Sequence, residues 1–325
     1  MESPVRRVVF LDVATFGNVS LKGFSERWDC TVHDLTAPEE VSERVEGFDG
    51  VVVNKVRLDK TLLNSPAAAD IRLIAEAATG TDNVDLEAAK SRGIYVCNVP
   101  GYATQSVAQF AIALILELAT RAGAYAEIVR RGAWQQSPMY TRMDFSTAEV
   151  SGKKLGIIGY GSIGRRVAEM ARGLGMEVLI SARPGSSGPV PAGRLAVDDL
   201  LASSDFVSLH CPLTAETRSL INSRVIGLMK PAAFLINTAR GALIDETALI
   251  AALRTKRLAG AALDVISQEP PSDDHPIIRA AHELENLIVT PHCAWTAREA
   301  RQRLMNEVAE NILAFCRGER RNSVV

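Results

Sequence analysis

The sequence predicts an α/β fold in which two doubly wound parallel sheets form separate domains with a cleft between them. The chain has 325 residues, of which 47% are hydrophobic, and this length exceeds a single domain of roughly 100 to 200 residues. Short strand-like runs alternate with helical patterns, which is typical of parallel sheets covered by helices. A glycine-rich turn after the first strand of the second series favours a nucleotide-binding architecture there.

The first series of predicted strands covers residues 7–11, 50–54, 73–75 and 94–97. A long helix follows at residues 104–130, and its small and aliphatic residues suit close packing between layers. We expect this helix to lead into the second domain. Residues 134–150 are mixed in polarity and weakly periodic, so they form either a loop or an arm against another subunit, and the sequence leaves both alternatives open.

The second series of predicted strands covers residues 154–158, 177–181, 206–209, 233–237, 260–264 and 287–290. About six strands with intervening helices match a doubly wound dinucleotide domain. The amphipathic segment 297–316 follows the last strand, and we expect it to pack back on the first domain. The predicted boundaries give one domain from residues 1–99 and 296–325 and a second domain from residues 100–295.

Composition and charge favour a small-molecule partner. Lys plus Arg is 36 and Asp plus Glu is 38, giving 36 − 38 = −2, so no bulk charge attracts nucleic acid or a membrane surface. Five cysteines without CxxC spacing argue against a disulfide framework and a metal site, and they suit the reducing cytoplasm. The N-terminus lacks a signal-peptide pattern. The longest apolar stretch, residues 110–119, is shorter than the roughly 20 residues that span a bilayer.

The turn after the first strand of the second series carries a dinucleotide-binding pattern. Gly159, Gly161 and Gly164 form GxGxxG between an apolar strand and a helix, and Ser162 and Ile163 begin that helix. The first glycine permits a tight turn, the second lets the backbone approach a pyrophosphate, and the third lets helix pack on strand. The alternative is a merely structural glycine turn. The full strand, turn, helix and strand context favours dinucleotide binding.

The end of the next strand predicts which dinucleotide binds. An acidic side chain normally holds the adenosine ribose hydroxyls at this point, but the sequence reads Ser181, Ala182, Arg183. Arg183, helped by the hydroxyls of Ser181, Ser186 and Ser187, can pair with a 2′-phosphate that a carboxylate would repel. NADP(H) is therefore favoured over NAD(H). The alternatives are that Arg183 is a solvated loop residue or that it stacks on the adenine of NADH.

Three polar residues lie at or just after predicted strand ends, where ligands of open α/β sheets gather: Arg240, Glu269 and His292. Reducing a ketone with hydride needs an acid that protonates the developing alkoxide, and a histidine suits this task. Glu269 would stabilise and orient the protonated imidazole. Arg240 would bind an α-keto carboxylate and polarise the adjacent carbonyl. Taken singly, each residue is more often a surface ion-pair partner or a structural residue.

These motifs form a recognisable pattern, because residues 159–295 resemble the D-isomer-specific 2-hydroxy acid dehydrogenases. In that family the arginine of NTARG, the glutamate of QEP and the histidine of TPH are the catalytic trio, which corresponds to Arg240, Glu269 and His292. The likeness covers nearly the whole chain. AATGTDNVD and VTPHCAWTAREARQRLMNEVAENILAF are similar to the glycerate dehydrogenase, or hydroxypyruvate reductase, branch. The resemblance implies two Rossmann-like domains and a homodimer built through the cofactor domains.

The resemblance also implies how the first domain binds substrate. The backbone amides of Lys55 and Val56, together with the turn at Thr79 and Gly80, would hold the substrate carboxylate.

On the cofactor side, the resemblance places Val107 near the nicotinamide and Asp264 at its carboxamide. Without the resemblance, Asp264 would be interpreted as a helix cap and Pro212 as a loop-shaping residue. Family members that prefer NADH carry Asp or Glu at the position of Ala182, so NAD specificity is not carried over. The remaining groove would be lined by His210, Pro212, Thr217, Thr238 and Ala239.

The expected activity is the reduction of a small 2-keto acid, hydroxypyruvate or glyoxylate, to D-glycerate or glycolate. A bulkier or phosphorylated 2-keto acid is the first alternative. The second is a non-catalytic dinucleotide sensor similar to the related transcriptional corepressors. Formate dehydrogenase is disfavoured, because that relative has glutamine where this chain has Glu269.

Overall fold

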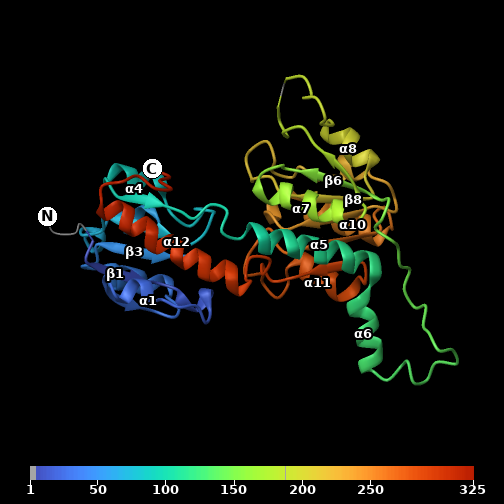
Figure 1. Ribbon diagram of the computed structural model, residues 1–325, viewed down its shortest axis with the longest axis horizontal. Helices are drawn as coiled ribbons and strands as arrows, with labels where there is room; N and C mark the ends of the chain where they lie inside the picture. Colours follow the sequence, from blue (N-terminus) through green and yellow to red (C-terminus); the bar gives the residue numbers. More distant parts are fainter. Residues whose placement is uncertain (1–4, 187) are drawn as a thin grey trace. The chain divides into compact units, whose positions relative to one another are not determined.

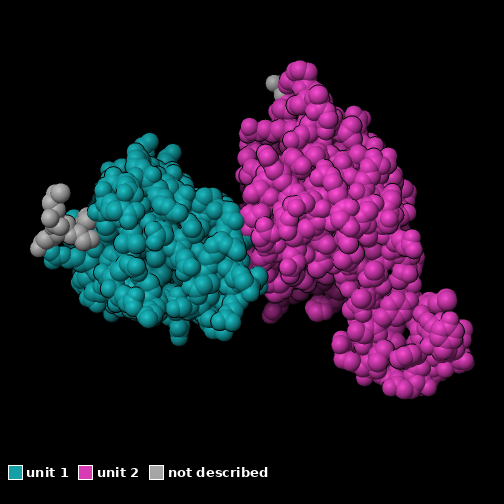
Figure 2. Space-filling model, viewed as in Figure 1, with its two compact units in different colours: residues 1–103, 296–325 teal, residues 104–295 magenta. Residues whose placement is uncertain are grey.

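The computed structural model describes residues 5–186 and 188–325, so Ser187, one of the predicted hydroxyl partners, lies outside the described residues. The chain divides into two compact units, coloured in Figure 2. Unit 1 comprises Met1–Ala103 and Thr296–Val325, and unit 2 comprises Thr104–Trp295. Unit 2 is therefore inserted into the chain of unit 1. The predicted breaks are after residues 99 and 295.

Unit 1 is built on a five-stranded sheet with the order β2-β1-β3-β4-β5, in which every pairing is parallel. All residues of β3 and β4 are buried. This burial explains their nearly continuous apolar sequence, because strands covered on both faces need no polar alternation. The strands are β1 (Arg7–Phe10), β2 (Asp29–Val32), β3 (Gly50–Val53), β4 (Leu73–Glu76) and β5 (Tyr95–Cys97).

The two edges of this sheet are formed by segments that the sequence pattern does not predict. β2 lies at one edge, and its side chains are exposed or half-buried, so no apolar pattern marks it. At the other edge, Ser323 forms an antiparallel bridge with Cys97, and the Val324 amide donates to the carbonyl of Val96.

The helix α12 (Arg298–Cys316) returns to unit 1 and packs on β4, as Figure 1 shows in red. It buries Leu304, Met305, Val308 and Ile312. The prediction that this segment packs on the first domain is confirmed. The other helices of unit 1 are short: α1 (Lys22–Ser25), α2 (Val41–Val45), α3 (Lys60–Leu63) and α4 (Leu86–Ser91), with 3₁₀ turns η1 (Val13–Phe16), η2 (Pro38–Glu40) and η3 (Pro66–Ala68).

The last residue of β4, Glu76, is a fully buried acid. Asn83 Nδ2 donates a hydrogen bond of 3.0 Å to Glu76 Oε2, and Oε1 has no partner among the described residues. Burial raises the pKa of the Glu76 carboxyl well above its usual value of 4.5, and the Asn83 hydrogen bond opposes the rise. The folded chain holds this proton more tightly than the unfolded chain does. The resulting stabilisation is complete below pH 4.5 and is lost as the pH rises through the folded pKa.

We therefore expect Glu76→Gln to raise the melting temperature by several degrees at pH 8. The neutral amide keeps an oxygen for the Asn83 bond and needs no buried charge. The gain should shrink as the pH falls towards 4.5, and calorimetry across this range measures it. A variant that melts at or below the wild-type temperature at pH 8 would contradict the explanation.

Unit 2 is built on a six-stranded sheet with the order β11-β10-β9-β8-β6-β7, again with parallel pairings throughout. A single parallel bridge between Ser181 and Leu195 extends the sheet beyond β7. The chain order reverses between β6 and β8, and ligands of doubly wound sheets bind at the carboxyl ends of the strands at such a point. The strands are β6 (Lys154–Ile158), β7 (Glu177–Ile180), β8 (Phe206–Leu209), β9 (Phe234–Asn237), β10 (Gly260–Leu263) and β11 (Leu287–Val289).

The helix predicted at residues 104–130 is in fact two helices, α5 (Thr104–Thr120) and α6 (Ala122–Arg130), so the prediction of a single helix is wrong. Arg121 between them has φ 56°, and this left-handed conformation cannot continue a right-handed helix. The bend is 64°, and the Gly123 amide donates to the Glu117 carboxylate across it. Residues 134–150 contain neither helix nor strand.

The remaining helices of unit 2 cover its sheet (Figure 1). No single described helix is long and apolar enough to cross a membrane, and the bent pair α5 and α6 passes that test by length and composition only. The helices are α7 (Ser162–Gly173), α8 (Val197–Ser203), α9 (Ser223–Ile226), α10 (Glu246–Arg254) and α11 (Pro276–Glu283), with the 3₁₀ turn η4 (Gly241–Leu243).

Candidate active site

The turn between β6 and α7 has the geometry that a dinucleotide requires. Gly159 has φ +97°, and a Cβ there would lie 2.4 Å from the backbone nitrogen of Cys211. A Cβ on Gly164 would lie 2.1 Å from the Gly159 carbonyl oxygen, so glycine lets α7 approach β6. No atom lies within 4 Å of the Cβ position of Gly161, at the N-terminus of α7. This open backbone and the helix amides fit a pyrophosphate.

Two predicted cofactor residues have buried hydroxyl groups with no hydrogen-bond partner among the described residues, Ser181 and Thr238. Buried hydroxyl groups in proteins are nearly always paired. Ser181 directly follows β7 and Thr238 directly follows β9, so both lie at the carboxyl edge of the sheet. Ser162 and Ile163, the first residues of α7, lie at the same edge. The hydroxyls therefore fit a polar ligand bound along this edge.

Arg183 begins a tight turn beyond β7. Ser186 Oγ donates a hydrogen bond of 2.7 Å to the Arg183 carbonyl oxygen, so this hydroxyl shapes the turn. The neighbouring Ala182 is buried, whereas the Arg183 side chain is exposed. In the described part of the chain, no carboxylate lies within 4.0 Å of the Arg183 guanidinium group. Its contact with a phosphate stays a prediction.

Glu269 and His292 form a hydrogen-bonded pair, with 2.5 Å between Glu269 Oε2 and His292 Nδ1. The second carboxylate oxygen, Oε1, accepts a hydrogen bond of 2.9 Å from the Ile266 amide. Both side chains of the pair are 31% exposed, so a small molecule can reach them. The carboxylate is thus held by its own loop and engages one nitrogen of the imidazole, which leaves Nε2 for chemistry.

Asp264 holds the loop that carries His292. Its buried carboxylate accepts hydrogen bonds from Thr290 Oγ1 at 2.6 Å, from the Cys293 amide at 2.9 Å and from the Ala294 amide at 2.9 Å. His292 has φ 51°, and its amide donates to the Asp264 carbonyl at 2.8 Å. Asp264 therefore fixes an unusual backbone conformation. Oδ2 accepts only the Ala294 bond among these, so the predicted contact with a carboxamide still has an acceptor.

Arg240 is positioned by its own strand end. Asn237 Nδ2 donates to the Arg240 carbonyl at 2.8 Å, Asn237 Oδ1 accepts from the Ala239 amide at 3.0 Å, and Arg240 Nη1 donates to the Ala239 carbonyl at 2.9 Å. A Cβ on Gly241 would lie 1.9 Å from the carbonyl carbon of Ile266. The arginine segment and the glutamate loop are therefore in direct backbone contact, which brings the predicted trio to one region.

A second group of polar residues holds the loop that carries Glu269. Glu246 Oε1 accepts from the Ser267 amide at 2.7 Å, and Oε2 accepts from Ser267 Oγ at 2.8 Å. His275 is buried, and its Nδ1 accepts from the Ile277 amide at 3.3 Å. Its Nε2 lies 3.4 Å from Ser267 Oγ and 3.7 Å from Glu246 Oε2. These contacts fix the segment that leads to Glu269.

The other predicted cofactor residues lie on loops after β8 or on α5. Burial lowers the pKa of His210 to about 4, so this histidine is neutral near pH 7, and its Nε2 lies 2.9 Å from Ser208 Oγ. Thr217 is buried, and its hydroxyl donates to the Pro212 carbonyl at 2.8 Å. Val107 is buried on α5. Their contacts with a cofactor stay predictions.

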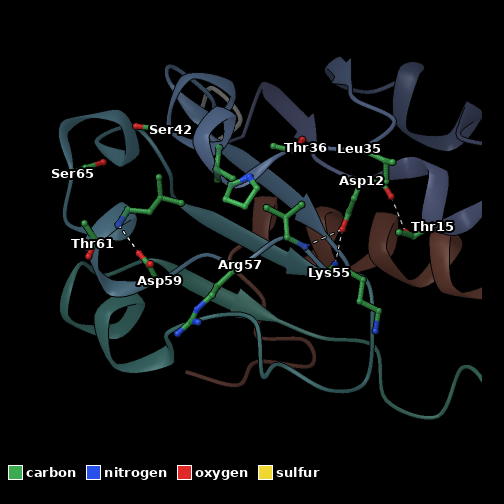
Figure 3. Close-up of a pocket in the computed structure, with 14 residues that line it drawn as sticks. Asp12, Thr15, Leu35, Thr36, Ser42, Lys55, Arg57, Asp59, Thr61 and Ser65 are labelled. Carbon is green, nitrogen blue, oxygen red and sulfur yellow. Dashed lines mark hydrogen bonds between the residues drawn. The ribbon is translucent and has the colours of Figure 1, made fainter. Parts of the chain in front are cut away.

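In unit 1, the amides expected to hold a substrate carboxylate already have a carboxylate partner. Lys55 N and Val56 N donate to Asp12 Oδ2 at 2.6 and 3.2 Å, and the Asn54 amide donates to both oxygens. Figure 3 shows the Asp12 carboxylate pointing at this backbone. Burial raises the pKa of Asp12, and the three amide hydrogen bonds oppose the rise. A role for Lys55 and Val56 in substrate binding stays a prediction, and Asp12 would compete with that role.

The amides of Thr79 and Gly80 differ from those of Lys55 and Val56. In the described chain, neither of them donates a hydrogen bond to the protein. The Thr79 hydroxyl donates to the Val99 carbonyl at 2.9 Å. These two amides are available to an anion. A hollow of about 620 Å³ adjoins Lys55 and Val56, where the segments after β1, β2 and β3 meet (Figure 3).

Comparison with known proteins identifies the family. The model of the D-isomer specific 2-hydroxyacid dehydrogenase NAD binding domain matches residues 112–294. This chain belongs to that family. Glycerate dehydrogenase of Methylorubrum extorquens is 39% identical over 98% of this chain and 99% of that protein. Hydroxypyruvate reductase of Blautia hydrogenotrophica is 38% identical over 95% of each chain.

Among solved structures, an NADPH-dependent glyoxylate/hydroxypyruvate reductase from Sinorhizobium meliloti, in complex with NADP and malonate, has a TM-score of 0.81 and 25% identity. The match covers 98% of this chain and 97% of that chain. The fold of this chain is thus the two-domain Rossmann-like fold that the sequence predicts.

The residues that hold the predicted catalytic side chains could not be found from the sequence. Glu246, Ser267 and His275 carry no motif, and only their hydrogen bonds reveal them. Gly241 directly follows Arg240, and a glycine beside a predicted catalytic residue is a usable signal of close backbone approach. Across residues 5–186 and 188–325, no group of three or more His, Cys, Asp or Glu side chains could hold a metal ion.

Proposed function

We propose that this protein reduces hydroxypyruvate and glyoxylate to D-glycerate and glycolate, using a nicotinamide dinucleotide as the hydride source. The single observation that carries the proposal is the hydrogen bond of 2.5 Å between Glu269 and His292, in the same unit as the glycine turn. An acid paired with a carboxylate is what ketone reduction requires of the protein. The relatives named glycerate dehydrogenase and hydroxypyruvate reductase support the substrate class.

Each residue of the trio has its own role in the proposed reaction, in which the bound cofactor supplies the hydride. His292 Nδ1 faces Glu269, so the proton on Nε2 is the one given to the developing alkoxide of the substrate. Glu269 stabilises the imidazolium before transfer and fixes the ring orientation. Arg240 binds the keto acid carboxylate and polarises the adjacent carbonyl.

The test is an initial-rate assay of purified protein with hydroxypyruvate, glyoxylate, pyruvate and phenylpyruvate, run with NADPH and NADH in parallel. Turnover of hydroxypyruvate and glyoxylate above the other two acids is expected. A preference for phenylpyruvate would replace the proposed substrate with a bulkier acid. No turnover of any acid, together with measurable cofactor binding, would refute the enzymatic proposal.

We further infer that NADP(H) is the preferred cofactor, because Arg183 follows a strand end without any carboxylate. The neighbour crystallised with NADP supports this preference. Arg183→Ala should lower kcat/KM with NADPH by about 3- to 10-fold, because an exposed charge contributes modestly. The value with NADH should stay near that of the wild type. Equal losses with both cofactors would place Arg183 away from the 2′-phosphate.

We also propose a homodimer formed through unit 2. Five of the nine large apolar side chains exposed in the described residues lie between positions 129 and 143, and Tyr140 is 91% exposed. An apolar surface of this kind marks an interaction site, and the family resemblance makes a second copy its occupant. Sedimentation velocity at micromolar concentration tests this, and a monomer would contradict it.

The cytoplasm is the proposed location. All five cysteines are free, which supports a reducing compartment.

A further inference from the structure

We propose that Arg194 is the fixed half of a two-arginine clamp for the 2′-phosphate of NADP(H), held in place by the Tyr160 ring, with Arg183 as the exposed half. This inference rests on the proposed NADP(H) preference and names the residue that determines it.

The bridge beyond β7 carries Arg194 to the strand end where the adenosine ribose of a dinucleotide binds. The Ala182 amide donates to the Leu195 carbonyl at 2.7 Å, and the Leu195 amide donates to the Ile180 carbonyl at 2.9 Å. Arg194, one residue earlier, donates from Nη1 to the Ser181 carbonyl at 3.3 Å. Its guanidinium group is therefore tied to the residue whose hydroxyl is buried and has no partner among the described residues.

The Tyr160 ring connects this arginine to the glycine turn. Arg194 Cζ lies 4.7 Å from the ring centroid, and Arg165 Cζ lies 5.5 Å from the same centroid. Arg165 Nε also donates to the Tyr160 carbonyl at 3.2 Å. Tyr160 lies between Gly159 and Gly161 in the glycine turn. The ring that contacts Arg194 is therefore attached to the same backbone segment that fits the pyrophosphate.

The arginine side chains around this strand end favour the binding of an anion. In the described residues, no carboxylate lies within 4.0 Å of the guanidinium groups of Arg165, Arg183 or Arg194. The acid that interacts with Arg183 is Glu216, whose pKa is lowered first by its Thr214 hydrogen bond and least by the Arg183 charge. A phosphate that binds guanidinium groups forms paired, charge-assisted hydrogen bonds with them.

Arg194 should contribute more than Arg183, because it is already ordered. Arg183 is exposed, and its side chain must be immobilised when a ligand binds. Arg194 is half-buried and has the Tyr160 ring and the Ser181 carbonyl as partners. A preorganised guanidinium group loses less conformational entropy on binding.

The experiment is calorimetric titration with adenosine 2′,5′-bisphosphate and with 5′-AMP, which needs no turnover. Arg194→Ala should raise the Kd of the bisphosphate by about 10- to 100-fold, with a much smaller change for 5′-AMP. Arg172→Ala is the matched control, because Arg172 is an exposed arginine on α7 about 15 Å from the first residue of the helix. It removes the same charge and should leave both affinities unchanged.

Two substitutions of Tyr160 test the support. Tyr160→Phe keeps the ring and should bind the bisphosphate like the wild type. Tyr160→Leu removes the ring and should weaken the bisphosphate several-fold, with 5′-AMP less affected. A thermal melting curve recorded for each variant tests whether that variant is folded.

The outcomes separate the two proposals. The clamp alone is overturned if the wild type prefers the bisphosphate but Arg194→Ala leaves both Kd values unchanged. It is also overturned if Arg194→Ala raises the Kd of the bisphosphate and of 5′-AMP by the same factor. A wild type that binds 5′-AMP as tightly as the bisphosphate overturns the NADP(H) preference and the clamp with it.

Discussion

His292→Asn should lower kcat for hydroxypyruvate reduction by about 100- to 10,000-fold, the usual contribution of a positioned general acid. The amide has no proton to give to the alkoxide at neutral pH, whereas the glycine turn and the strand ends that fit the cofactor are untouched. Single-turnover rates and a fluorescence titration with NADPH measure the two effects separately. A variant that loses cofactor binding as well as turnover would contradict the assignment of His292 to proton transfer.

Glu269→Gln is the companion variant, because it can keep a hydrogen bond to His292 but removes the charge. The amide keeps the ring orientation but no longer offsets the positive charge of the imidazolium that gives up the proton. We therefore expect kcat for hydroxypyruvate reduction, measured from initial rates, to fall by about 10-fold or more, with NADPH binding unchanged. A variant with the kcat of the wild type would contradict a role for the Glu269 charge.

Gly241→Ala should lower kcat by about 100-fold, because a displacement of about 1 Å at a catalytic group costs this much. The new Cβ would lie 1.9 Å from the Ile266 carbonyl carbon and 2.5 Å from the Ser267 nitrogen. That peptide must move, and its Ser267 amide donates the hydrogen bond to Glu246. The Ile266 amide, one peptide earlier, donates the hydrogen bond to Glu269. The free energy of unfolding should fall by about 1 to 3 kcal/mol, as for other overpacked sites.

Gly173→Ala is the matched control for this substitution. No atom lies within 4 Å of the Cβ position of Gly173, and its φ is not positive. Activity should stay at the wild-type level. Chemical denaturation followed by circular dichroism compares the two variants, and a Gly241→Ala protein with wild-type kcat would refute the role of this backbone contact.

Buried strands of unit 2 could be predicted from the sequence because burial on both faces leaves a continuous apolar run. β6 and β8 have the predicted bounds, Lys154–Ile158 and Phe206–Leu209. β2 could not be predicted, since its exposed side chains carry no such run. The residue at the break, Arg121, is neither glycine nor proline. It lies 5.2 Å from the Phe145 ring centroid, a contact that local sequence does not encode.

The candidate site, like the fold, could be predicted from the sequence only in part. Motifs point to Glu269 and His292, but not to the hydrogen bonds that hold them. The Asp12 carboxylate reaches amides more than 40 residues further along the chain, and Arg194 reaches Ser181 only through a one-residue bridge. Such contacts depend on how strands are ordered in the sheet, and residue spacing does not record that order.

The return of α12 to unit 1 determines the order in which the molecule can be completed on the ribosome. Domains generally fold as units while synthesis proceeds from the N-terminus. Unit 2 is one continuous stretch, Thr104–Trp295, whereas unit 1 needs residues 296–325 to cover β4. The nascent chain can therefore finish its second unit while its first still exposes the sheet face that α12 covers. Unit 1, whose strands are synthesised first, is therefore the unit that is completed last.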